Sequence, residues 1–287
     1  MKKLASLILF AFVFVQPAYS WDFSAFVQKN SEQKKENEIV RFINKQVKYA
    51  NKTDLKRFIS TYDDSYLSND GIDKEKYESL VKDVWSSFKD IKYGVSIKNI
   101  EILDENNAKV ELIETTYAEI NLSKAYQGEL KSKADSVYYL KKDESKRWKV
   151  VSDKVLNELT TMLYGTAKNL DIKITVPQKV ETNSDYTASL EFALPQDCFA
   201  VASIVADKVE YPQKPVKEVF RVLPEDNILE RIFTSNTENS DEYVIATVGL
   251  TKTAIKDLNI QLSLTGFGYA IKRVNVVDKE VEDDKIK

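Results

Sequence analysis

The sequence predicts an α+β domain, in which helices pack on a curved antiparallel sheet, followed by an all-β sandwich domain. Apolar residues recur at helical spacing between about residues 36 and 88, which indicates amphipathic helices. From Lys92 onward the apolar residues recur at every second position, which is typical of strands. A basic and then apolar leader precedes both regions and is considered first.

The leader has the three parts of a secretory signal peptide. Lys2 and Lys3 precede an apolar run over residues 4–15, and the small residues Ala18 and Ser20 occupy the positions that a signal peptidase reads. The run is shorter than the about 20 apolar residues that span a bilayer. We expect residues 1–20 to be removed and the mature protein to be exported, either to the periplasm or outside the cell. An uncleaved N-terminal anchor is the alternative.

The composition excludes several chemistries. The chain has no histidine, so Ser-His-Asp triads, Cys-His pairs and His-ligated zinc are ruled out. Gly266-Phe267-Gly268 lacks the third glycine of a dinucleotide-binding loop. We therefore expect no catalytic motif, no metal and no cofactor. The net charge of −3 argues against a nucleic-acid partner. Cys198, the only cysteine, sits beside Phe199 and is interpreted as a core residue rather than a reactive thiol.

The first domain is expected over residues 22–165. Its helices are predicted over residues 36–50, from Thr53 as N-cap to Tyr62, and from Asp73 as N-cap to Phe88. Strands are predicted over residues 95–102, 109–120, 126–141 and 148–152, and helices followed by a meander indicate one sheet that wraps the helices. Leucines at helical spacing predict a short connecting helix over residues 156–163, ended by Gly165.

The second domain is expected over residues 169–279. About seven short strands separated by turns, several of them marked by proline, favour an immunoglobulin-like sandwich. Only the architecture is indicated, because the chain lacks the Cys…Trp…Cys pattern of true immunoglobulin domains. The last residues, 280–287, are charged and poor in apolar residues, so we expect a disordered tail and no further membrane-spanning segment.

Three segments carry a resemblance to a known family. They are Asp54-Leu55-x-x-Phe58-x-x-x-Tyr62, Trp85-x-x-Phe88 and Trp148-Lys149-Val150-Val151-Ser152. Over about residues 36–155 the order of elements resembles the nuclear transport factor 2-like superfamily, which includes ketosteroid isomerases and polyketide-cyclase relatives. The resemblance implies a conical fold with a pocket between sheet and helices.

Catalytic members of this superfamily use Asp with Tyr, or His with Asp, and the absence of histidine leaves only the first version. Asp135 and Asp153 are the aspartates near the third and fourth strands, and strand alternation puts Asp135 on the face opposite Tyr138. Neither aspartate matches the isomerase motif, so no catalytic residue is assigned.

A pocket in the cone would have aromatic walls suited to a small hydrophobic or amphipathic ligand. The alternative is that the same rings simply fill the core. The candidate lining residues are Tyr62, Tyr66, Trp85, Phe88, Tyr117 and Tyr138.

The leading hypothesis for function is a non-enzymatic exported binding or assembly protein of the bacterial cell envelope, with an envelope protein or a small hydrophobic ligand as partner. The alternatives are a small-molecule carrier and an Asp/Tyr-type isomerase or dehydratase that uses the cone pocket. A buried carboxylate within hydrogen-bonding reach of a tyrosine, in an open cavity, would favour the enzyme.

Overall fold

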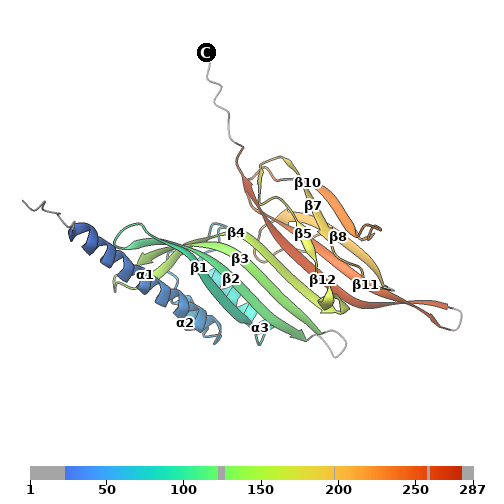
Figure 1. Ribbon diagram of the computed structural model, residues 1–287, viewed down its shortest axis with the longest axis horizontal. Helices are drawn as coiled ribbons and strands as arrows, with labels where there is room; N and C mark the ends of the chain where they lie inside the picture. Colours follow the sequence, from blue (N-terminus) through green and yellow to red (C-terminus); the bar gives the residue numbers. More distant parts are fainter. Residues whose placement is uncertain (1–22, 122–126, 197, 257–258, 280–287) are drawn as a thin grey trace, which may run out of the picture.

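The computed structural model describes residues 23–121, 127–196, 198–256 and 259–279. The signal peptide expected over residues 1–20 and the tail expected over residues 280–287 lie outside the described residues. In the described part of the chain, strands make up much more of the fold than helices do (Figure 1).

Helices open the described chain: α1 (Phe23–Ala50), α2 (Leu55–Ile59) and α3 (Lys74–Ser87). Asp73 caps α3, as predicted, because its carboxylate accepts a hydrogen bond from the Lys76 amide at 2.8 Å. The cap of α2 is Asp54 and not the predicted Thr53. Asp54 accepts from the Arg57 amide at 3.2 Å, whereas Thr53 has a φ of 49° and lies in the turn before the helix.

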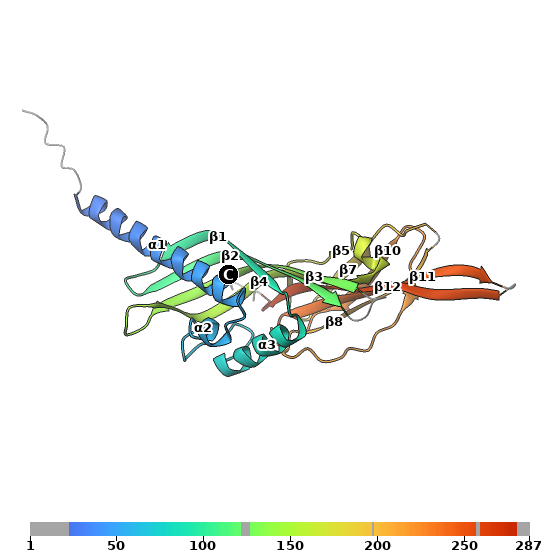
Figure 2. The same cartoon turned by 90° about the horizontal axis from the view of Figure 1, so that it is seen from below.

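The helices pack on a curved antiparallel meander of four strands (Figures 1 and 2): β1 (Lys92–Ile102), β2 (Asn107–Asn121), β3 (Gln127–Lys142) and β4 (Trp148–Gly165). Ile39 and Ile43 of α1 are fully buried against Val110 of β2 and Val150 of β4. Trp148 lies in the sheet and is 5% exposed. This arrangement matches the predicted helices on a curved sheet.

The helix predicted over residues 156–163 is wrong, because that segment belongs to β4. It pairs with β3 on one side and with β12 (Asn259–Val277) on the other. The β-branched Thr160 and Thr161 suit a strand, and both faces of this stretch are covered by other elements. Gly165 ends the strand with a φ of +59°, where a Cβ would collide with the Thr265 carbonyl oxygen.

The remaining elements form the second part of the chain. The main sheet continues in the order β4-β12-β11-β8-β9, with β6 parallel to β12, and a second sheet has the order β10-β7-β5. One apolar core lies between the two sheets, so this part is a sandwich. Its elements are η1 (Thr166–Asn169), β5 (Lys173–Thr175), β6 (Lys179–Glu181), β7 (Asp185–Glu191), β8 (Cys198–Lys208), β9 (Arg221–Val222), β10 (Ile228–Thr234) and β11 (Glu242–Lys256).

The two parts share one continuous sheet, which the sequence did not indicate. Leu159 and Leu163 of β4 contribute to the sandwich core, whereas Met162 and Tyr164 contact the cluster beneath the helices. The two parts are therefore covered on opposite faces of the same sheet. The immunoglobulin-like assignment is not confirmed, and a domain boundary between residues 165 and 169 stays a prediction.

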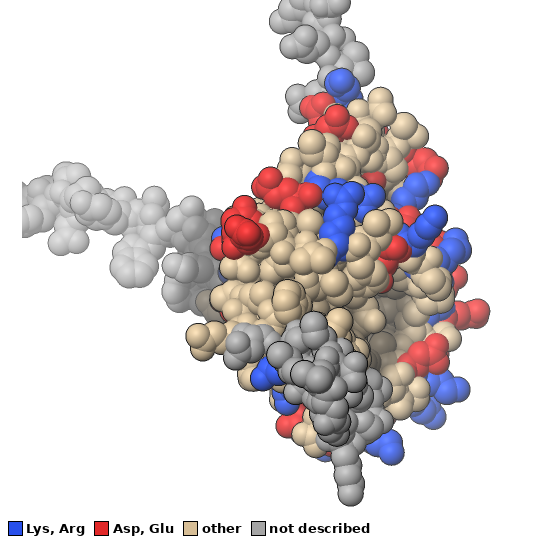
Figure 3. Space-filling view, turned by 90° about the vertical axis from the view of Figure 1, so that its right-hand side faces the viewer, with Lys and Arg blue, Asp and Glu red and all other residues tan. Residues whose placement is uncertain are grey.

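The sandwich end of the molecule carries exposed apolar side chains. Phe199 of β8 is 57% exposed, Val222 of β9 is 69% exposed and Leu262 of β12 is 67% exposed. In the view onto this end, an uncharged area lies between rims of charged residues (Figure 3). Cys198 at the start of β8 is buried, as expected. No helix in the described ranges has both the length and the apolar character needed to cross a membrane.

Candidate functional site

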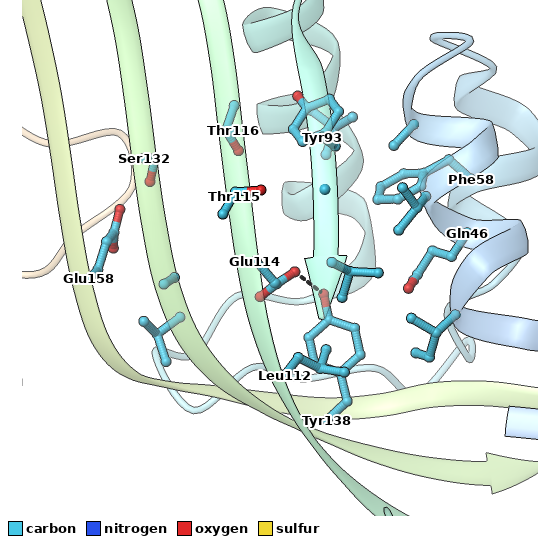
Figure 4. A pocket seen from close by; sticks show the side chains of 18 of the residues that line it. Gln46, Phe58, Tyr93, Leu112, Glu114, Thr115, Thr116, Ser132, Tyr138 and Glu158 are labelled. Carbon is cyan, nitrogen blue, oxygen red and sulfur yellow. Dashed lines mark hydrogen bonds between the residues drawn. The ribbon is translucent and has the colours of Figure 1, made fainter. Parts of the chain in front are cut away.

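Two adjoining cavities, of about 240 and 440 Å³, lie between the concave face of the sheet and the helices. Figure 4 shows the smaller one, with Phe58 and Gln46 on the helical side and strands β2, β3 and β4 on the other. Both cavities share part of their wall: Tyr77, Val81, Tyr93, Glu114, Thr116, Ser132, Tyr138 and Val155. We treat them as one candidate site.

The sheet wall of the site has polar side chains in its middle and apolar side chains toward its ends. Cross-strand register aligns residues of β2, β3 and β4 in rows that point to one face. The polar rows contain carboxyl and hydroxyl groups, and the Thr160 hydroxyl donates to the Ser132 hydroxyl at 2.7 Å. These rows are Glu114–Ala134–Glu158 and Thr116–Ser132–Thr160.

Two β-bulges in β4 decide which of its side chains face the cavities. The register between β3 and β4 shifts at Val151 and again at Leu156, each of which is an extra residue in β4. Asp153 therefore pairs directly with the inward-facing Tyr138, although strict alternation from Val150 would put Asp153 on the outer face. The second bulge restores the alternation that starts at Val150, so Glu158 faces the smaller cavity as well.

Glu114 and Tyr138 form the first carboxyl–phenol pair. The Tyr138 hydroxyl donates to Glu114 Oε1 at 2.7 Å (Figure 4). Burial raises the pKa of Glu114, the nearby hydroxyl groups of Ser136 and Tyr138 lower it, and the negative charge of Glu158 raises it further. Burial followed by the charge of Glu114 raises the pKa of Tyr138 well above 10. Tyr138 therefore keeps its proton, and Glu114 loses its proton less readily than an exposed glutamate does.

Asp153 and Tyr66 form the second pair, on the wall of the larger cavity. The Tyr66 hydroxyl donates to Asp153 Oδ1 at 3.1 Å. Burial, and then the negative charge of Glu114, raises the pKa of Asp153 to about 7. Burial and the nearby Asp153 also raise the pKa of Tyr66. Asp153 is thus a carboxyl group that changes charge near neutral pH.

The second part of the chain also reaches this site. Tyr211, in the segment between β8 and β9, lines the larger cavity together with residues of α3. Its hydroxyl lies 2.8 Å from the Tyr243 hydroxyl, which donates to Glu158 Oε2 at 2.9 Å. Burial raises the pKa of Tyr211 to about 12. A chain of hydroxyl groups therefore connects the two cavities through a strand of the sandwich.

A buried ion cluster fixes the two parts together beside the site. The fully buried Arg273 of β12 contacts Asp70, at 3.0 Å in one of its hydrogen bonds, and Asp241, at 2.6 Å. Asp70 precedes α3 and also lines the larger cavity. The cluster therefore ties the loop that leads into α3 to the sandwich.

The structure brings together most of the aromatic residues predicted to line a pocket. Trp85 lines the smaller cavity, Tyr66 and Phe88 line the larger one, and Tyr138 lines both. Tyr62 is 1% exposed and lies behind this wall, where its hydroxyl donates to the Tyr77 hydroxyl at 3.1 Å.

Tyr117 lies away from the site. Its side chain is 39% exposed, on the opposite face of β2 from Glu114 and Thr116. Asp135 also points to the outer face, where it accepts a bond from Lys98 at 2.5 Å.

The sequence interpretation missed Glu114 and Glu158. Glu114 had a readable signal, because it follows Val110 and Leu112 on the alternating inward phase of β2, where a charged residue is unusual. Glu158 was missed because its segment was predicted to be a helix, although strand alternation from Val150 would have placed it inward, since the two bulges cancel. Among the described residues, no group of three or more His, Cys, Asp or Glu side chains is arranged to hold a metal ion.

Comparisons with known proteins find similarity only among solved structures. No protein-family model matches the sequence, and no curated protein matches it significantly. A protein from Novosphingobium aromaticivorans, provisionally assigned as a scytalone dehydratase, is 13% identical, with a TM-score of 0.38, over 44% of this chain and 86% of that one. A ketosteroid isomerase-like protein from Erwinia carotovora atroseptica is 13% identical, with a TM-score of 0.32, over 41% and 88%. ActVI-ORFA from Streptomyces coelicolor is 12% identical, with a TM-score of 0.32, over 42% and 92%. At these values the similarity carries no conclusion about activity.

Proposed function

We propose that the cavity between helices and sheet binds a small, largely apolar molecule and that its carboxyl–phenol pairs transfer a proton to and from that molecule. One observation supports this most strongly: two half-buried carboxyl groups, Glu114 and Asp153, each accept a hydrogen bond from a tyrosine on the wall of an open cavity. The same arrangement was expected to distinguish an enzyme from a passive binding protein.

The chemistry follows from the two environments. A general base is most effective when its pKa lies near the working pH, as that of Asp153 does at about 7. Asp153 would remove a proton from a carbon atom next to a carbonyl group. Tyr138, whose pKa burial raises well above 10, would remain protonated and donate a hydrogen bond to the oxygen atom on which negative charge develops. Returning the proton to another carbon gives isomerisation, and expelling hydroxide as water gives dehydration.

Membership of the nuclear transport factor 2-like superfamily is part of this proposal. The order of helices and strands and the carboxyl–phenol pairs support it, because catalytic members of that superfamily use aspartate with tyrosine. Export to the bacterial envelope and an interaction role for the sandwich are also proposed. The leader over residues 1–20 supports the first, and the exposed apolar residues Phe199, Val222 and Leu262 support the second.

A carrier that binds without reacting is the second candidate. The helical side of the larger cavity is apolar, with Leu80, Val84 and Phe88 of the α3 region, and a wall of this kind suits retention of an apolar molecule. A carrier and an isomerase differ in whether the bound molecule is converted.

Isomerisation of cyclohex-3-enone to cyclohex-2-enone tests the proposal, because formation of the conjugated enone is followed directly by its absorbance. The wild-type protein should exceed acetate buffer in rate, and Asp153→Asn should reduce the rate about 100-fold or more. Asp135→Asn is the matched control on the outer face of the sheet and should retain the rate. Binding of the enone without conversion would favour the carrier, and wild-type rates no higher than those of acetate would contradict proton transfer.

A further inference from the structure

The charges that line the cavities are of one sign. Among the described residues on their walls, four are carboxylates and none is a lysine or arginine: Asp70, Glu114, Asp153 and Glu158. Arg273 compensates only the first of these directly, because its guanidinium bonds to Asp70 and Asp241. The other three have hydroxyl groups as partners, since Tyr138, Tyr66 and Tyr243 donate to them. Their charge is therefore not balanced by a cation on the wall.

Aromatic rings form a large part of the remaining wall. The rings meet at steep angles: Phe58 and Trp85 have centroids 5.6 Å apart at 55°, and Tyr66 and Tyr77 have centroids 5.6 Å apart at 52°. Aromatic faces attract cations through the ring quadrupole. The rings that line one or both cavities are Phe58, Tyr66, Tyr77, Trp85, Phe88, Tyr93, Tyr138 and Tyr211.

We infer that the ligand of this cavity is an organic cation: an ammonium group on a small apolar or aromatic body. The inference rests on the cavity being the binding site, as proposed above, and not on proton transfer. An ammonium group near Glu114 and Glu158 would supply the missing counter-charge, and the body would lie against α3. An anionic ligand would instead place a further negative charge beside the carboxylates of Glu114, Asp153 and Glu158, in a region poor in water.

Binding of a cation has a further consequence for protons. Asp153 is surrounded by Tyr66, Tyr77, Tyr138, Glu114 and Asp70, with Arg273 beyond Asp70, so negative charge and burial outweigh the one nearby cation. A bound ammonium favours the ionised forms of Asp153 and Glu114. At pH 6.5, which is below the pKa of about 7 of Asp153, that carboxyl group is mostly protonated. Cation binding at this pH must therefore release protons to the solvent.

Three probes of one shape test the ligand class: 3-phenylpropylamine, 3-phenylpropanol and 3-phenylpropionate, each titrated into the full chain by calorimetry. The amine should bind about tenfold or more tightly than the alcohol, as charged hydrogen bonds predict, and the propionate should bind most weakly. The inference would be overturned if 3-phenylpropionate bound as tightly as the amine, if all three probes bound with equal affinity, or if the amine did not bind.

Substitutions of the two glutamates test which negative charges make the amine bind more tightly than the alcohol. Glu158→Gln and Glu114→Gln should each weaken amine binding by about tenfold while leaving the affinity for the alcohol within about twofold. Asp135→Asn, on the outer face, is the matched control and should change neither affinity. Amine affinity unchanged in both glutamine variants would overturn the assignment.

Proton release gives a readout on the wild-type protein alone, which does not depend on the folding of a variant. Titrations of the amine at pH 6.5 in two buffers of different ionisation enthalpy should show net proton release, and the alcohol should show none. Amine binding without proton release would count against the carboxylates as partners. Failure of proton transfer is a separate result, because it appears in the conversion of cyclohexenone and leaves the order of the three affinities unaffected.

Discussion

The hydroxyl of Tyr138 on β3 donates to Glu114 on β2 at 2.7 Å, within an open cavity and on the face of the sheet that the helices cover. Interior carboxyl groups are costly unless they are partnered, and a phenol partner stabilises the carboxylate only in part. The contact therefore holds Glu114 in place while leaving it able to accept or donate a proton.

Tyr138→Phe removes the phenol from this pair. We expect the rate of cyclohexenone conversion to fall by about tenfold or more, because the pKa of Glu114 rises further and its orientation is lost. Tyr139→Phe is the matched control, since that neighbouring side chain is 39% exposed on the other face of β3. Steady-state kinetics of both variants measure the effect. An equal loss of rate in the two variants would show that Tyr138 contributes only to the stability of the fold.

The rate should rise as the pH increases through about 7, because Asp153 must lose its proton to act as a base. Asp153→Asn should abolish this limb of the pH–rate profile. A wild-type profile that is flat between pH 5.5 and 8 would exclude a base with the pKa of Asp153.

Stability should change in the opposite direction. The pKa of Asp153 is raised on folding, from about 3.9 in the unfolded chain, so between about pH 4 and 7 the unfolded state binds fewer protons than the folded state. The contribution of Asp153 to the free energy of unfolding therefore falls as the pH rises through that range. The free energy of unfolding of Asp153→Asn minus that of the wild type should therefore be larger at pH 8 than at pH 4.5, by about 2 kcal/mol. Urea unfolding at the two pH values measures this, and an unchanged difference would contradict the raised pKa.

Arg273→Met should destabilise the chain strongly, because it leaves Asp70 and Asp241 buried without their cation. Loss of one partner from a buried ion cluster costs about 3–5 kcal/mol. Arg147→Met is the matched control: its side chain is 70% exposed in a pair with Asp143, and exposed pairs contribute about 1 kcal/mol or less. Chemical unfolding compares the two, and a loss in Arg273→Met no larger than in the control would show that the cluster does not hold the two parts together.

A fragment of residues 23–168 should not fold as a stable unit. It retains the helices and β1–β4 but loses β12, which pairs with β4 and covers Leu159 and Leu163. Exposed apolar residues on an unpaired edge strand favour association. Size-exclusion chromatography and thermal unfolding by circular dichroism test this. A monomeric fragment with a cooperative transition near that of the full chain would show that the two parts are independent.

Local patterns in the sequence were sufficient for the first half of the fold. The amphipathic stripe with Ile39 and Ile43, the cap at Asp73 and the strand containing Trp148 all follow from spacing within a few residues. The helix predicted over residues 156–163 failed because Leu159 and Leu163 face the sandwich core while Met162 faces the cluster beneath the helices. This situation depends on β12, about a hundred residues further along the chain.

The chemistry of the site was less accessible from the sequence than its aromatic walls. Tyr66, Trp85 and Tyr138 were named because their types and spacing are visible. Glu158 was missed because its segment was predicted to be a helix. Asp153 was considered but not assigned, because it points inward only through the bulge at Val151. Such irregularities arise from strand pairing and carry no signal in alternation alone.

The most direct test of the proposed site is the titration of Asp153 itself, followed by the ¹³C resonance of its side-chain carboxyl group and assigned by comparison with Asp153→Asn. The resonance should titrate with an apparent pKa of about 7. A value at or below about 4, as in an ordinary exposed aspartate, would contradict a proton-transfer site in this cavity.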